Sequence, residues 1–181
     1  MPFTGKKTHR SLRDLRKDCS GAAAVEFCFI AAFLSLAVVN VADIGIYLYK
    51  RMEVENAALV GSMSAVKACD PSHLPATINC PTLTAAVTAS IQSTSLGAAV
   101  TLSGGGVTEG YYCINASNAL QYMSDASSKP TDCSAAGMAA LQPADYVLVT
   151  VTYSYAPLFG SVSVAGTFGT PIVAIAIVRM L

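Results

Sequence analysis

The sequence predicts an α+β protein in which one long N-terminal helix packs on a small antiparallel sheet. Two observations predict the helix: residues 28–39 carry no charge, and no proline occurs between residues 3 and 70. A third predicts the sheet, because the second half of the chain holds short apolar or alternating segments separated by Gly and Pro. Since these segments follow one another with turns, the strands should run antiparallel.

The chain begins with a basic leader, which holds six of the 11 Lys and Arg residues: Lys6, Lys7, Arg10, Arg13, Arg16 and Lys17. A basic leader before a long apolar helix indicates a membrane protein with the leader on the cytoplasmic side. The leader is short and lacks interleaved aromatic residues, and the rest of the chain is acidic on balance. We therefore expect a single-pass membrane protein and no nucleic-acid partner.

We expect the helix to cross the membrane over residues 22–49, which span about 42 Å against a hydrocarbon core of about 30 Å. Tyr47 and Tyr49 would then lie in the interfacial aromatic belt. The helix should continue outside the membrane over residues 50–68 and end at Cys69-Asp70-Pro71. Its apolar residues at helical spacing are expected to pack on the sheet: Met52, Leu59, Met63 and Val66.

Glu26 is the unusual residue of the apolar run. A carboxylate there costs about 2.5–3.5 kcal/mol at the bilayer centre and less near its edge. Two explanations other than a specialised stem remain open, a cleaved secretory signal and a plain signal anchor. The run is long for a secretory signal, Glu26 interrupts it, and no small-x-small cleavage site closes it.

The segment around this carboxylate resembles the processing site of type IV pilin-related proteins: Gly21 followed by Ala22-Ala23-Ala24-Val25-Glu26-Phe27. More narrowly, it resembles the TadE-like pseudopilins (minor pilins) of the tight-adherence (Tad, or Flp) type IV pilus system. The stem of that family often continues through a YxxRxxxxNAA pattern, which is matched here by Tyr47, Arg51, Asn56, Ala57 and Ala58. The resemblance covers roughly residues 13–61.

The resemblance implies a pilin-like fold and processing between Gly21 and Ala22, so that the cytoplasmic leader, residues 1–21, is removed. Glu26 would become the fifth residue of the mature chain and attract the N-terminal amine of a neighbouring subunit, which sets subunit register together with Phe27. A charge pair in a medium of low dielectric constant favours one register strongly. The simpler alternative is a Glu26 side chain that reaches the lipid headgroups.

The function that the resemblance implies is to initiate or cap assembly of a Tad pilus, from the bacterial inner membrane with the C-terminal domain in the periplasm or at the pilus tip. The implied partners are the prepilin peptidase, the major pilin, a sister pseudopilin and the inner-membrane assembly platform. A membrane-anchored adhesin or binding module without pilin-type cleavage is the alternative. We expect no enzyme activity, catalytic residue or cofactor, because the chain has no Walker A, HExxH, GxSxG or Rossmann motif.

Residues 69–181 are expected to form the globular domain. The expected elements are a helix over Leu83–Ser93 with Thr82 as its cap, a hairpin, a strand over Tyr146–Tyr155 and a final strand over Ile172–Val178. The hairpin would join Ala98–Leu102 to Tyr111–Ile114 through a turn at Gly104-Gly105-Gly106. Three remaining segments read as loops or a short strand: 70–82, 115–142 and 161–165.

Four cysteines of this domain are disulfide candidates: Cys69, Cys80, Cys113 and Cys133. An even set in an exported domain indicates disulfides, and three connectivities are open. We favour Cys69–Cys80 and Cys113–Cys133, since each closes a local loop worth about 3 kcal/mol in the chain-entropy model. Cys19 and Cys28 should be unpaired. Zinc is disfavoured, because no CxxC occurs and His73 is the only histidine nearby.

The remaining polar residues suggest no metal site. Asp125 and Asp132 near Cys133 do not have the spacing of an EF-hand calcium loop. Like Glu109 and Asp145, they read as scattered loop carboxylates that are solvated or cap a helix. Asn40 and Asp43, near the outer edge of the apolar run, are expected either at the membrane interface or in contact with an assembly partner.

Overall fold

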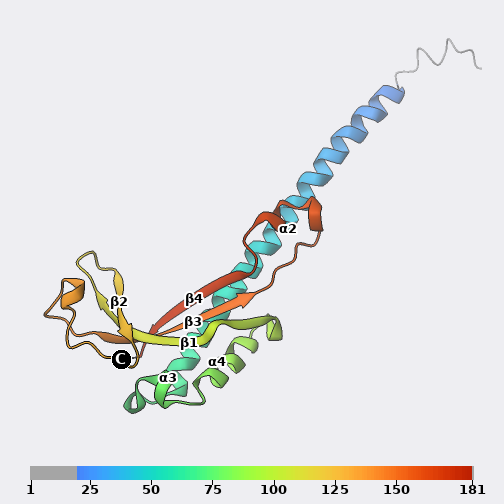
Figure 1. Cartoon of the computed structure of the whole chain (residues 1–181). Coiled ribbons are helices and arrows are strands. Elements are labelled where there is room, and N and C mark those ends of the chain that lie inside the picture. The colour runs from blue at the N-terminus through green and yellow to red at the C-terminus, as the bar shows by residue number, and fades with distance from the viewer. Residues whose placement is uncertain (1–19, 181) are drawn as a thin grey trace, which may run out of the picture.

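The computed structural model describes residues 20–180. Its first element, α2 (Ser20–Ala68), is one helix of 49 residues, about 73 Å long. Figure 1 shows that its N-terminal part projects alone, while the rest of the chain gathers around its C-terminal part. The α+β, pilin-like arrangement of a long apolar helix followed by an antiparallel sheet is therefore confirmed.

A four-stranded sheet follows the helices, with the order β2-β1-β3-β4 and every pair antiparallel. Its strands are β1 (Val100–Ile114), β2 (Leu120–Asp125), β3 (Ala144–Tyr153) and β4 (Ile172–Arg179). β3 begins and ends two residues before the expected range. The alternation expected for it is present, since Val147, Val149 and Val151 are fully buried.

One face of the sheet is covered by α2 and α4 (Leu83–Gln92), and the main core lies between them. α4 contributes large side chains, Leu83, Val87 and Ile91, whereas α2 contributes mostly small ones. A Cβ on Gly61 would lie 2.7 Å from Cγ2 of Ile91 and 3.0 Å from Cγ1 of Val149. Small residues thus bring the backbone of α2 close to both neighbours.

The expected core face of α2 is wrong. Met52, Leu59, Met63 and Val66 are 60%, 53%, 63% and 40% exposed. The opposite face, with Val54, Ala57, Ala58 and Ala65, is buried instead. The buried face of α2 is the one that lets the helix approach the sheet most closely. The spacing of the large apolar residues had predicted the opposite face.

The expected hairpin between Ala98–Leu102 and Tyr111–Ile114 is also wrong. Both segments belong to one long strand, β1, which pairs with β3 on either side of an irregularity between Leu102 and Val107. Gly104 and Gly106 have φ angles of 66° and 100°, which glycine adopts without strain. The glycines therefore bend a strand and do not reverse the chain.

Other elements of the domain differ from the expectation in detail. β2 lies within the segment expected to be irregular, and α3 (Ala76–Asn79) lies in the expected loop 70–82. α4 ends at Gln92, and Thr82 makes no side-chain capping hydrogen bond. Short 3-10 helices occur at Pro71–His73, Gly97–Ala99, Ser134–Ala136, Gly160–Val162 and Val164–Thr167. The last two occupy the segment expected as a short strand or extended loop.

Two disulfides join the pairs favoured above. Cys69–Cys80 ties the end of α2 to the loop before α4, and Cys113–Cys133 ties the end of β1 to residues 115–142. We call residues 115–142 the arm; it lies at the end of the sheet far from the N-terminus of α2 (Figure 1). The arm has a small core of its own, made of Cys113, Cys133 and Ala136 with Met123 and Met138.

Candidate assembly site on the stem helix

The N-terminal turns of α2 present the residues singled out in the sequence. Gly21, Ala22 and Glu26 are exposed, and Phe27 is 70% exposed. Glu26 is the sole charged residue between positions 20 and 42, and it makes no hydrogen bond or ion pair within residues 20–180. Cleavage after Gly21 and the register role of Glu26 and Phe27 stay predictions, and Cys19 lies outside the described residues.

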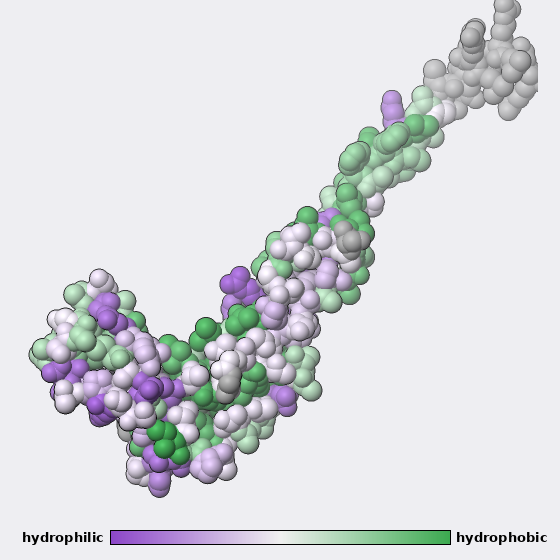
Figure 2. Space-filling model, viewed as in Figure 1, coloured by the Kyte–Doolittle hydropathy of each residue, from purple (hydrophilic) through white to green (hydrophobic). Residues whose placement is uncertain are grey.

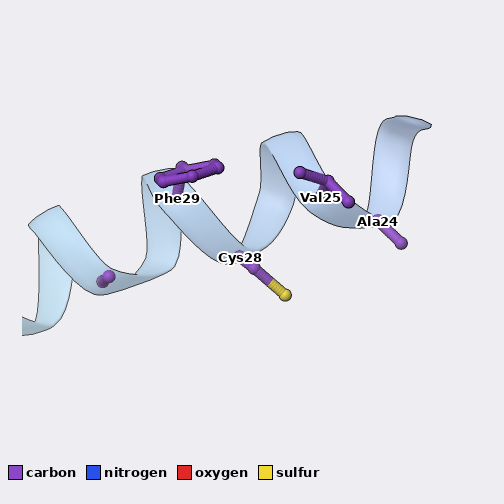
Figure 3. A pocket seen from close by; sticks show the side chains of 5 residues that line it. Ala24, Val25, Cys28 and Phe29 are labelled. Carbon is purple, nitrogen blue, oxygen red and sulfur yellow. The ribbon is translucent and has the colours of Figure 1, made fainter. Parts of the chain in front are cut away.

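A shallow groove follows one side of these turns, lined by Ala24, Val25, Cys28, Phe29 and Ala32. Figure 3 shows the Cys28 sulfur pointing away from the helix axis, between the side chains of Ala24 and Phe29 along the ribbon. Cys28 is unpaired and exposed, as expected. Because the lining is apolar, this surface suits acyl chains or another apolar helix and offers no group that would hold a polar ligand.

The globular part first meets α2 at Asn40. The Asn40 side-chain amide donates to the carbonyl oxygens of Leu36 and Val162 at 2.8 and 3.4 Å, and its oxygen accepts from the Val164 N–H at 2.8 Å. Residues 21–39 therefore form the free part of the helix, about 28 Å long at 1.5 Å per residue. α2 is long and apolar enough to cross a membrane, and its most apolar stretch is not buried in the protein.

Asp43 is fully buried inside the chain, so the expectation of an interfacial or partner-binding side chain is wrong for it. Its Oδ1 accepts hydrogen bonds from the Tyr155 hydroxyl at 3.1 Å and the Leu158 N–H at 3.0 Å. Burial and the Asp43 carboxylate together raise the pKa of Tyr155 to about 12, which keeps that hydroxyl a donor. A buried carboxylate needs such partners, and only the fold supplies them.

Tyr47 also belongs to this junction and not to an exposed aromatic belt. Its ring packs 5.2 Å from that of Tyr155 and 4.8 Å from that of Phe168, centroid to centroid. Tyr49 is 55% exposed. The segment 155–168 is thus held against α2 by the polar contacts of Asn40 and Asp43 and by the aromatic contacts of Tyr47.

The large apolar side chains of α2 point away from the sheet along most of its length. We call this row the outer stripe; its members are 40–71% exposed and are Val41, Leu48, Met52, Leu59, Met63 and Val66. Spacings of seven, four and three residues place them on one face of the helix. No element among residues 20–180 packs on this row, which continues past the junction to the end of α2.

Glu109 and Asp145 form an acidic pair that sequence reasoning placed in solvated loops. The Glu109 carboxylate accepts from the N–H groups of Ala76 and Thr77 at 2.7 and 2.6 Å, and from the Thr77 hydroxyl. Asp145 is 7% exposed, and neither carboxylate oxygen has a hydrogen-bond partner. Burial first, and then the Glu109 carboxylate, raise the pKa of Asp145 to about 7. The sequence did contain one signal of this burial, because Asp145 falls in the same alternating positions of β3 as the buried valines.

Asp125 and Asp132 cap turns. Each Oδ1 accepts from the backbone N–H two residues on, in Ser127 and Ser134. These serine hydrogen bonds hold the pKa of both carboxyls below the usual value. Among residues 20–180, no group of three His, Cys, Asp or Glu side chains is placed to hold a metal ion.

Comparisons of this chain with protein-family models, with curated proteins and with solved structures find no match. The features that bear on function are therefore the exposed surfaces of α2 and the residues at its N-terminal end.

Proposed function

We propose that this chain is a non-enzymatic, TadE-like pseudopilin: a single-pass protein of the bacterial inner membrane that is processed between Gly21 and Ala22. It initiates or caps assembly of a Tad pilus, with its disulfide-bearing domain in the periplasm or at the pilus tip. Its partners are the prepilin peptidase, the major pilin, a sister pseudopilin and the inner-membrane assembly platform.

The free part of α2 supports the membrane portion of the proposal. Its length of about 28 Å approaches the hydrocarbon thickness of about 30 Å. The span then runs from residue 22 to about residue 39, shorter than the range 22–49 expected from the sequence, because the segment 155–168 packs on one side of α2 from Asn40 onward. The basic leader supports a cytoplasmic N-terminus.

Glu26 supports the assembly portion. It is a lone exposed carboxylate in an apolar helix, and its cost in lipid is offset when a cation pairs with it. Cleavage after Gly21 would create such a cation, the amine of Ala22, on each neighbouring copy. Small residues at positions 22–24 allow stems to approach closely.

The outer stripe is the observation that carries the proposal. An isolated membrane-anchored domain gains nothing from exposing Met52, Leu59, Met63 and Val66 on the part of its helix outside the bilayer. A stem that bundles with other stems buries such a row along its whole length. The stripe is the surface that stem-to-stem packing requires.

Intact mass and N-terminal sequencing of the membrane protein, with and without the peptidase, test the processing. We expect a mature chain that begins at Ala22 only when the peptidase is active. A chain that still begins near Met1 in its presence contradicts the proposal, and the anchored adhesin or binding module then becomes the leading interpretation.

A second arm tests assembly. Glu26→Gln should still be cut but should lower incorporation into pili at least about tenfold, because the charge pair is lost. Glu55→Gln is the matched control, since Glu55 is an exposed carboxylate on the same helix whose partner is Arg51. Equal incorporation of both variants would remove the register role from Glu26.

A further inference from the structure

The globular part ends, on the side of the free helix, in an apolar and uncharged surface. We call residues 157–168, which pack on one side of α2, the shoulder; Figure 1 shows this segment in orange-red beside α2, at the edge of the globular part nearest the free helix. Its exposed apolar side chains are 42–68% exposed and are Leu158, Phe159, Val162 and Val164. No Asp, Glu, Lys, Arg or His occurs between Asp145 and Arg179. Such a patch is typical of an interaction site.

Asn40 and Asp43 set the level of the shoulder along α2. The Asn40 side chain accepts from the Val164 N–H at 2.8 Å, and the Asp43 Oδ1 accepts from the Leu158 N–H at 3.0 Å. The free part of α2 below this level is about 28 Å long, slightly less than the hydrocarbon core of about 30 Å. Figure 2 shows a mostly hydrophobic surface along this projecting helix, with the strongly hydrophilic side chains gathered mainly over the globular part. A bilayer that covers the free part therefore reaches the shoulder.

Exposed charge is absent from α2 at the level of the shoulder. Asp43 is the sole charged residue of the sequence between Glu26 and Lys50, and it is fully buried. On the side of α2 that the shoulder leaves free, Val41 is exposed. The next charged residue of the helix, Lys50, lies about 15 Å beyond Asn40. The shoulder thus converts the only polar interruption of the helix above Glu26 into a surface that tolerates lipid.

The backbone of the shoulder pairs its polar groups within the protein. Irregular backbone is tolerated at membrane depth only where such pairing occurs. The N–H groups of Leu158 and Val164 donate to side chains of α2. Further N–H groups donate to carbonyl oxygens of the shoulder itself, at 3.2–3.4 Å: those of Val162, Ser163, Gly166 and Phe168. The shoulder therefore meets the hydrogen-bonding condition for a position in the lipid interface.

We propose that the shoulder inserts into the lipid leaflet opposite the leader, at the boundary between headgroups and acyl chains. Leu158, Phe159, Val162 and Val164 contact acyl chains there, and the shoulder fixes how deeply α2 sits in the bilayer. Lipid is the occupant because the membrane span itself brings lipid to this level, and a protein partner would have to displace it. The inference rests on the membrane span of the proposed function, and it is independent of processing and of pilus assembly.

Single-tryptophan variants of the full-length protein in vesicles test the insertion. The chain contains no Trp, so each variant reports on one position. The vesicles are phosphatidylcholine with acyl chains brominated near the headgroup, because bromine quenches the fluorescence of a tryptophan that it contacts. Val162→Trp should lose at least about half of its emission in these vesicles. Ile114→Trp, also at an exposed apolar position but at the end of β1 beside the arm, is the matched control and should keep its emission.

Phe33→Trp, at an exposed position of the free helix, separates this inference from the membrane span on which it rests. It should be quenched by lipids brominated near the ends of the acyl chains. No quenching of Phe33→Trp would contradict the span and the insertion together. Quenching of Phe33→Trp without quenching of Val162→Trp, or equal quenching of Ile114→Trp and Val162→Trp, would overturn the insertion alone.

A charge placed on the shoulder is the final arm. Leu158→Glu added to Val162→Trp should reduce the quenching about threefold, because a carboxylate at this depth costs free energy and moves the shoulder toward water. Ile177→Glu, at an exposed position of β4, is the control and should leave the quenching unchanged. Circular dichroism checks that both variants are folded. Equal quenching in the two variants would show that the apolar side chains of the shoulder do not make the contact, which overturns the proposal.

Discussion

Two polar side chains in the apolar half of α2 determine where the domain is attached to its stem. Asn40 hydrogen-bonds the backbone of Val162 and Val164, and Asp43 accepts from Tyr155 and Leu158. A polar side chain costs free energy when it is buried without a hydrogen-bond partner and not when it is paired. These contacts therefore fix where the segment 155–168 attaches to α2. The same residues that mark the end of the apolar run therefore mark the end of the free helix.

Asp145 differs from Asp43 because burial gives it no hydrogen-bond donor. Its carboxyl lies beside Glu109, whose oxygens are already held by Ala76 and Thr77. With the pKa raised from 3.8 to about 7, the folded protein binds a proton at pH values where the unfolded chain has lost it. Stability should therefore fall as the pH rises from about 4 to about 7 and level off above that.

The pH dependence is the first prediction. We expect the free energy of unfolding of the full chain in detergent to drop by on the order of 2 kcal/mol between pH 4.5 and pH 7.5. Asp145→Asn should flatten this slope, because the amide does not ionise. Urea unfolding followed by near-ultraviolet circular dichroism measures both.

Asp132→Asn is the matched control for this experiment. Asp132 is a partly exposed carboxylate whose pKa is lowered, and an amide oxygen can still accept from the Ser134 N–H. The stability that its lowered pKa contributes is fully present above about pH 4 and is lost only below it, so the slope between pH 4.5 and pH 7.5 should persist. A wild-type protein of constant stability over this range would show that Asp145 ionises normally.

At the scale of elements, the two faces of α2 differ more in the size of their side chains than in polarity. Its inward face carries Ala57, Ala58, Gly61 and Ala65, and its outward face carries the outer stripe. Small residues permit a close approach to α4 and β3, where dispersion contacts are dense. The large residues stay outside, where only another molecule or lipid can cover them.

Gly61→Ala is the prediction that belongs to this packing. The added methyl group would overlap Ile91 and crowd Val149, so we expect a loss of about 1–3 kcal/mol in the free energy of unfolding, despite the better helix propensity of Ala. Urea unfolding of the full chain, as above, provides the measurement.

Gly45→Ala is the matched control. Gly45 lies in the same helix, and a Cβ added to it would have no neighbouring atom within 4 Å, so its substitution should be neutral or stabilising by up to about 1 kcal/mol. If both substitutions behave alike, the close approach at Gly61 is not a constraint on the fold.

At the scale of the whole molecule, two cores and two disulfides divide the globular part. Cys69 belongs to the main core with α2, α4 and the sheet, whereas Cys113 and Cys133 belong to the small core of the arm. Each disulfide therefore stabilises a different cooperative unit. We therefore expect the arm to open without loss of the stem contacts.

Removal of each disulfide tests this division. Cys69→Ser with Cys80→Ser should lower global stability by about 3 kcal/mol and raise amide exchange throughout the sheet. Cys113→Ser with Cys133→Ser should raise exchange mainly in β2 and the arm. Hydrogen exchange measured by mass spectrometry distinguishes the two patterns, and global unfolding of the second variant would mean that the arm and the main core form one unit.

Much of this molecule follows from local sequence. Charge asymmetry, a long apolar run and the absence of proline predict α2. Alternation predicts β3, a short apolar segment after a turn predicts β4, and short loops favour the two disulfides. These features depend on neighbours in the chain, so they survive without knowledge of the fold. The order of residues in one short segment also identified Gly21 and Glu26, and the roles of these two residues remain predictions.

Tertiary structure decided the rest. Whether Gly104 and Gly106 reverse a chain or bend a strand depends on β3, which pairs with both halves of β1. The buried face of α2 depends on how closely α4 and the sheet can approach it. Asp43 and Asp145 acquire their surroundings from residues far away in the sequence, Tyr155 and Glu109. Contacts between distant segments set burial and pairing, and among these features only the burial of Asp145, in phase with the valines of β3, had a local signal.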